Sequence, residues 1–230
     1  MLSKKFLVKL LIPIASFSLL SSQSLLWAAP SENNIIPATS SRIHYTGRSY
    51  QTGENVVSIC WPGTSLETKF EGTSVGLYLE NAPNDYPDAN YINVFIDGEE
   101  LKPIRCDKDK NYILLKEGLK DTVHTLQIFK RTDSNAGPIN FKGIALDEGK
   151  QLIDPQIKND GLKIEFYGDS ILSGSAVEAP TYLEYTDQQL KNMNIEREPF
   201  SQFDTWNNYI AFPAITARNL NADLMLKSFV

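Results

Sequence analysis

Length, composition and charge exclude several classes of protein. The chain has 230 residues, 42% of them hydrophobic, with a formal net charge of −6 at pH 7 and a sequence pI near 5.0. That apolar content is enough to build packed cores and argues against an intrinsically disordered chain. Duplex binding needs clustered Lys and Arg, and the chain has no basic tract, so nucleic acid is not an expected partner.

The first thirty residues are typical of a secretory signal peptide. Lys4, Lys5 and Lys9 precede an apolar block at residues 10–20, and small residues follow it. The block is too short to span a bilayer comfortably. We therefore expect residues 1–29 to be a signal peptide and the mature protein to be secreted or periplasmic, with no membrane partner after cleavage. An uncleaved anchor is the alternative.

The two cysteines leave two alternatives open. Export permits a disulfide between Cys60 and Cys106. However, Cys60 lies in the apolar run 56–61, where a buried free thiol fits at least as well.

Residues 30–42 are polar and predict a linker, and residues 43–150 then predict an all-β sandwich. Val75, Leu77 and Leu79 alternate with other residues, as half-buried antiparallel strands do. Closely spaced short strands separated by turns indicate a sandwich of jelly-roll or immunoglobulin type. The predicted strands are 56–61, 65–70, 74–80, 91–96, 111–115, 123–130 and 139–146.

Residues 151–161 contain turn dipeptides and predict a second linker, after which the pattern changes. The apolar run 162–167 predicts a strand buried on both faces. A helix is predicted at 206–219, capped by Asp204 or Thr205 and kinked at Pro213, and a second buried strand at 223–230. A short helix is predicted around 188–193. Strand, loop, helix and strand together open a parallel α/β sheet.

Ser170 is the candidate nucleophile. It follows Gly168 and Asp169 directly after the 162–167 run, where open α/β sheets place their ligands. Gly168 and Gly174 bracket a loop whose backbone can bend sharply. An ordinary turn is the alternative, because Gly, Asp and Ser are common turn residues.

Several separate motifs carry a resemblance to known families. Those in the second half resemble the SGNH (GDSL-type) hydrolases: Gly168-Asp169-Ser170, Gly174, 206–209 and 216–223. Those in the first half are similar to the amino-terminal jelly roll of carbohydrate esterase family 2: 47–48, 61–65, 70–75, 93–98, 130–132 and 141–143. The chain departs from the usual hydrolase motif at Leu172, Ser175 and Ala176.

The resemblance implies an exported esterase that removes acetyl groups from polysaccharides such as xylan or glucomannan. Residues 162–230 would be the start of a flavodoxin-like, three-layer SGNH domain. Ser170 would attack the ester carbonyl and its backbone N–H would join the oxyanion hole, while Asp169 would support the loop. An acetylated polysaccharide or oligosaccharide is the expected partner, and no cofactor is implied.

A serine hydroxyl needs a neighbouring base, which is usually His. The chain has only His44 and His124, both upstream of Ser170. The family's base is a His near the carboxyl end of a longer domain, so we expect a C-terminally truncated member that is inactive alone. As an alternative, His44 or His124 reaches Ser170 across the domain interface.

A second class of function is also open: a carbohydrate-binding sandwich that carries a vestigial hydrolase segment. Its candidate sugar-stacking residues are Tyr45, Tyr50, Tyr86 and Tyr91, although aromatic residues in sandwiches more often belong to the core. The acidic pairs at 99–100 and 107/109 lack the spacing of a metal-binding loop, so no metal is expected.

Overall fold

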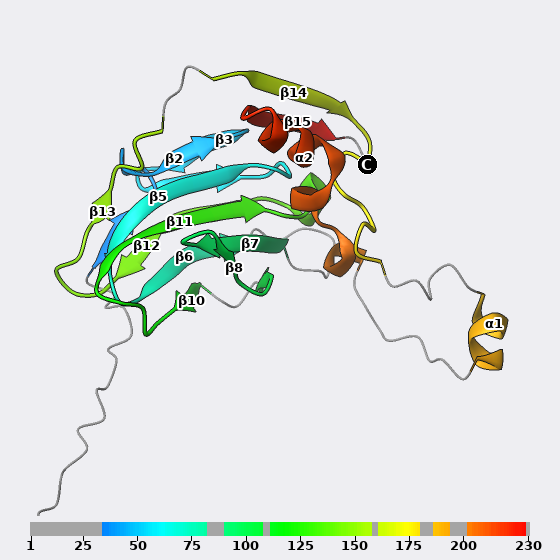
Figure 1. Ribbon diagram of the computed structural model, residues 1–230, viewed down its shortest axis with the longest axis horizontal. Helices are drawn as coiled ribbons and strands as arrows, with labels where there is room; N and C mark the ends of the chain where they lie inside the picture. Colours follow the sequence, from blue (N-terminus) through cyan, green and yellow to red (C-terminus); the bar gives the residue numbers. More distant parts are fainter. Residues whose placement is uncertain are drawn as a thin grey trace, which may run out of the picture.

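The computed structural model describes residues 34–81, 90–107, 111–157, 161–179, 186–193 and 202–228. Two antiparallel sheets form a β-sandwich, and a small α/β segment packs against it near the carboxyl end of the chain (Figure 1). Within these ranges no helix is long and apolar enough to cross a membrane. The expected signal peptide at 1–29 lies outside the described residues.

The first sheet has the strand order β10-β6-β12-β4-β3, and β1 also pairs with β12. Its strands are β1 (Ile35–Pro37), β3 (Ser49–Gly53), β4 (Val56–Ile59), β6 (Val75–Asn81), β10 (Tyr112–Lys116) and β12 (Ile139–Leu146).

The second sheet has the order β13-β5-β11-β7-β8, with β2 paired to β5 and β9 paired to β7. Its strands are β2 (His44–Thr46), β5 (Ser65–Gly72), β7 (Asn90–Ile96), β8 (Glu99–Glu100), β9 (Ile104–Cys106), β11 (Thr122–Lys130) and β13 (Leu152–Ile153).

The largest core lies between these two sheets, because alternate residues of each strand point inward. On β6, Val75, Leu77 and Leu79 are at most 1% exposed, and on β5 Leu66 and Phe70 are equally buried. These residues belong to one contiguous apolar cluster.

The α/β segment contains the parallel pair β14 (Lys163–Gly168) and β15 (Asp223–Ser228), in register from Lys163 opposite Asp223 to Gly168 opposite Ser228. The segment also contains α1 (Asp187–Asn192) and α2 (Phe212–Asn219). A smaller cluster joins it to the sandwich: Phe129, at the end of β11, packs with residues of α2 and β15.

The prediction that β14 is buried on both faces is wrong. Residues along β14 alternate between exposed and half-buried, and Tyr167 is 61% exposed. Among the described residues β14 pairs only with β15, so it is an edge strand and not the middle of a covered sheet. Its apolar sequence predicted burial, but no other described strand pairs with its outer edge.

The prediction of one kinked helix from Trp206 is also wrong. A 3-10 turn at 208–210 precedes α2, which begins at Phe212 with Pro213 in its first turn. Proline is well suited to that position because the N–H it lacks would have no helical partner there. The N-cap is Ala211, not Asp204 or Thr205.

Short strands occupy both predicted linkers. Residues 30–42 contain β1 and residues 151–161 contain β13, each pairing at the side of a longer strand. The second predicted strand, 223–230, is described only to Ser228. Cys60 and Cys106 are free thiols, and burial raises the pKa of each, that of Cys106 to about 12.

Candidate active site

The loop that follows β14 lies at the carboxyl edge of the parallel pair. Gly168 is opposite Ser228, so Ser170 comes two residues beyond the last paired position of β14. The loop then folds back on itself, since the N–H of Ser175 donates to the carbonyl of Ser170 at 2.9 Å. Ser170 is half-buried on this edge.

Two donors of Ser170 are unpaired within the described part of the chain. Neither its hydroxyl nor its backbone N–H makes a hydrogen bond with a described residue, whereas the next N–H, of Ile171, donates to Oδ1 of Asp169 at 3.0 Å. Asp169 is therefore engaged within the loop itself. A nucleophilic hydroxyl and an adjacent free N–H are two of the groups that acyl transfer requires.

His124 is engaged elsewhere. Its Nδ1 is 2.6 Å from Oδ2 of Asp97, and its Nε2 is 2.8 Å from the carbonyl of Lys120. His124 lies near the start of β11, whereas the α/β segment contacts the end of that strand. At a rise of about 3.3 Å per residue, the two ends are roughly 20 Å apart. His44 lies on β2, where its backbone is opposite Glu67 of β5 in the sandwich. Among the described residues, no contact joins either histidine to Ser170.

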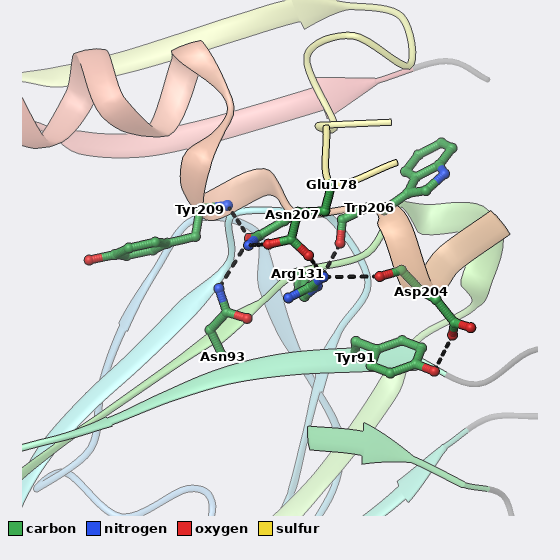
Figure 2. A network of polar contacts seen from close by, with 8 residues as sticks. All are labelled: Tyr91, Asn93, Arg131, Glu178, Asp204, Trp206, Asn207 and Tyr209. Carbon is green, nitrogen blue, oxygen red and sulfur yellow. Dashed lines mark hydrogen bonds and ion pairs between the residues drawn. The ribbon is translucent and has the colours of Figure 1, made fainter. Parts of the chain in front are cut away.

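Arg131, just after β11, ties the Ser170 loop to the sandwich. Its side chain is only 3% exposed; its Nε donates to the carbonyl of Trp206 at 2.6 Å and its Nη2 to that of Asp204 at 3.0 Å. The same Nη2 forms an ion pair with Glu178, at the far end of the loop, and the other oxygen of Glu178 accepts from Nδ2 of Asn207 at 2.6 Å. Figure 2 shows these side chains converging from the loop, the sandwich and residues 204–209.

Two residues of β7 extend this network. The hydroxyl of Tyr91 donates to Asp204, and Nδ2 of Asn93 donates to Oδ1 of Asn207 at 3.1 Å (Figure 2). Burial and the hydrogen bond to Asp204 raise the pKa of Tyr91 to about 12. Tyr91 is thus part of the interface and is not a free sugar-stacking surface.

The other aromatic candidates differ in their exposure. Tyr50 is 53% exposed, whereas the hydroxyl of Tyr45 donates to the carbonyl of Ala38 at 2.8 Å and its ring packs on Phe141. Tyr86 lies outside the described residues. In the acidic pair 107/109, Oδ1 of Asp107 accepts a hydrogen bond from Nε of Arg105 at 2.6 Å. Asp109 lies outside the described residues.

A cavity of about 480 Å³ lies between the sandwich and the α/β segment, but not at Ser170. Its lining includes Glu67, Gln127, Arg218 and Asp223, the last at the amino end of β15. Ser170 is at the opposite, carboxyl edge of the same parallel pair.

The sequence placed Ser170 correctly after a strand but did not reveal what holds its loop. Arg131 stood out only within the 130–132 motif, and Glu178 did not stand out at all. The two residues are 47 positions apart, and no local periodicity pairs them. Their opposite charges were the only available signal.

Comparison with known proteins gives one family match, to residues 45–155, described as carbohydrate esterase 2 N-terminal. The chain is 29% identical over 180 residues to the cellulase/esterase CelE of Acetivibrio thermocellus, covering 78% of this chain and 19% of CelE. It is 27% identical over 169 residues to an acetylxylan esterase / glucomannan deacetylase of Cellvibrio japonicus, covering 73% of this chain and 40% of that protein.

Solved structures similar to this chain include two family two carbohydrate esterases. A family two carbohydrate esterase from Clostridium thermocellum, in complex with cellohexaose, has a TM-score of 0.66 at 27% identity and covers 81% of this chain and 50% of its own. A family two carbohydrate esterase from Cellvibrio japonicus has a TM-score of 0.69 at 20% identity, which shows likeness of fold; 84% of this chain and 51% of that chain are covered. This chain thus spans less than half of the curated relatives named here and about half of these solved chains.

Proposed function

We propose that this chain, whose residues 45–155 match the carbohydrate esterase 2 N-terminal family, is a member of carbohydrate esterase family 2 and carries the nucleophile of an exported polysaccharide acetyl esterase. The substrates would be acetylated xylan or glucomannan, after the names of its relatives. We propose further that the sandwich is a jelly roll and that residues 162–230 begin an SGNH α/β domain.

The observation that carries the proposal is the position of Ser170. Its hydroxyl and backbone N–H are both unpaired among the described residues, at the carboxyl edge of β14. In the proposed reaction Oγ of Ser170 attacks the acetyl carbonyl, and the N–H stabilises the oxyanion that forms. The sugar hydroxyl leaves with a proton, and water then releases acetate from the acetyl-serine.

The reaction needs a base that accepts the proton of Ser170. His124 is held by Asp97 and Lys120, and no described residue contacts the serine hydroxyl. We therefore propose that the base comes from polypeptide other than the described residues, and that the described part is a poor catalyst without it.

Chemical rescue tests this proposal on the chain itself. The purified protein would be incubated with p-nitrophenyl acetate and with acetylated xylan, with and without imidazole as a diffusible base, and Ser170→Ala would be the matched control. We expect imidazole to produce acetate release above the control and an acetyl group on the Ser170 peptide in mass spectra.

Equal acetate release by the native chain and Ser170→Ala, with no acetylated Ser170, would contradict the proposal. Binding of xylan oligosaccharides in that case would favour the carbohydrate-binding alternative.

A further inference from the structure

We propose that Asp133, a residue of the sandwich, is a positioning residue for the Ser170 loop. The inference rests on the proposed function for its consequence in catalysis, but its geometry is independent of it. The sandwich would then be an integral part of the active site and not only an attached module.

Each carboxylate oxygen of Asp133 has a different task. The side chain is fully buried. Oδ1 accepts the backbone N–H of Asn135 at 2.9 Å and so caps the 3-10 turn at 134–136. Oδ2 accepts the hydroxyl of Ser173 at 2.7 Å and the hydroxyl of Ser228 at 2.6 Å. One oxygen is thus fixed by the sandwich's own turn, and the other binds the α/β segment.

The two serines that Asp133 binds belong to the two chain segments that meet at the candidate site. Ser173 is three residues after Ser170 in the same loop, and Ser228 is opposite Gly168 at the end of β15. Both serines are at most 2% exposed. Asp133 therefore joins the loop and the end of β15 at the edge where Ser170 lies.

A carboxylate suits this position because both serines act as donors. A charged acceptor forms stronger hydrogen bonds than a neutral one and has lone pairs for both hydroxyls. The backbone around it is held as well: Nζ of the buried Lys130 donates to the carbonyls of Thr132 at 2.8 Å and Asp133 at 3.0 Å.

Arg131 and Asp133 anchor different points of the loop. Arg131 binds Glu178 at the end of the loop, and Asp133 binds Ser173 near its middle. Ser170 lies between the end of β14 and the Ser173 anchor, so its position depends on that anchor. A displacement of about 1 Å at a reacting group costs up to about 100-fold in rate.

The test compares Asp133→Ala and Ser173→Ala with Asp97→Ala in the full chain. Asp97 is the matched control, because it also binds a backbone N–H and a side chain within the sandwich, but near the start of β11. Two properties are measured: the rate of Ser170 acetylation by p-nitrophenyl acetate in imidazole, and hydrogen exchange of residues 168–178.

We expect Asp133→Ala and Ser173→Ala to slow acetylation by about 10- to 100-fold and to speed exchange of the loop. Exchange of the sandwich strands stays unchanged in Ser173→Ala, which separates positioning from a loss of folding. Asp97→Ala leaves both properties of the loop unchanged.

Unchanged acetylation and unchanged loop exchange in Ser173→Ala would overturn the proposal, as would equal effects in Asp97→Ala. If native Ser170 is not acetylated at all, the proposed function fails, and loop exchange alone decides whether Asp133 positions the loop.

Discussion

Arg131 illustrates how single buried charges join the two parts of this protein. Its guanidinium binds two backbone carbonyls and the carboxylate of Glu178, so its donors find acceptors although it is nearly excluded from water. Planar guanidinium groups suit such multiple recognition better than ammonium groups do. Removing the Arg131 side chain would leave the carbonyls of Trp206 and Asp204 and the carboxylate of Glu178 without the donor that they bind.

We expect Arg131→Ala to lower the free energy of unfolding by about 3 kcal/mol, toward the lower end for a broken buried pair because Glu178 is partly exposed. Urea denaturation measures the loss. Lys142→Ala is the control, since Lys142 pairs with Glu80 at an exposed position and should cost less than about 1 kcal/mol. Equal losses in the two variants would show that the buried network is not stabilising.

The pair His124–Asp97 predicts a pH dependence of the sandwich. Burial lowers the pKa of His124, but its hydrogen bonds to Asp97 and to the Lys120 carbonyl outweigh burial and raise the pKa above the ordinary 6.5. A raised His pKa adds stability that is complete below 6.5 and is lost as pH rises through the folded value. The pKa of Asp97 is lowered below 3.8, so its contribution is lost only in stronger acid.

The melting temperature of the native chain should therefore fall more between about pH 6 and about pH 9 than that of His124→Gln. Thermal unfolding followed by circular dichroism over this range measures the difference. If melting temperature depends on pH in the same way for both proteins, His124 does not have a raised pKa in the folded state.

At the level of elements, the sequence predicted strands well where both core and solvent faces are present. The predicted strand 139–146 coincides with β12, whose inward residues Ile139, Phe141, Ile144 and Leu146 belong to the main apolar cluster. The short strands β1 and β13 were missed because two or three residues carry no period. The start of α2 was misplaced because Trp206 packs on Phe203 instead of on a helix face.

The site was predicted only in its local part. Gly, Asp and Ser after a strand identify a loop end, and Ser170 lies at that place. The anchors come from the sandwich, 40 or more residues away from the groups that they bind, and depend on tertiary docking that periodicity does not encode.

Gly174 provides a test of how tightly the loop is docked. Its φ is +78°, and an added Cβ would lie 2.5 Å from the carbonyl oxygen of Asn207. Gly98 has a similar φ of +81° with nothing within 4 Å, so Gly98→Ala measures the backbone strain alone, roughly 1 kcal/mol.

We expect Gly174→Ala to cost at least about 1 kcal/mol more than Gly98→Ala, since backbone atoms cannot move aside cheaply. Urea denaturation of both variants gives the difference. Equal costs would mean that the loop relaxes freely away from Asn207.

At the level of the whole molecule, apolar packing is unevenly divided between the two parts. The largest apolar cluster lies within the sandwich, whereas the described part of the α/β segment has a two-stranded sheet, and its small core includes Phe129 of the sandwich. Two strands alone are marginal in water.

We therefore expect residues 34–157 to unfold cooperatively when produced alone, and residues 161–228 to be unfolded alone. Circular dichroism and one-dimensional NMR of the two pieces test this. Dispersed NMR signals from the isolated second piece would show that the sandwich is not needed to order it.

The open side of β14 has a consequence for handling the protein. Among the described residues the strand bonds β15 on one edge only, and Tyr167 projects from its exposed end. Unpaired N–H and C=O groups along an edge are a template for a strand of another molecule. Concentrated preparations should therefore aggregate through β14 before the sandwich itself unfolds.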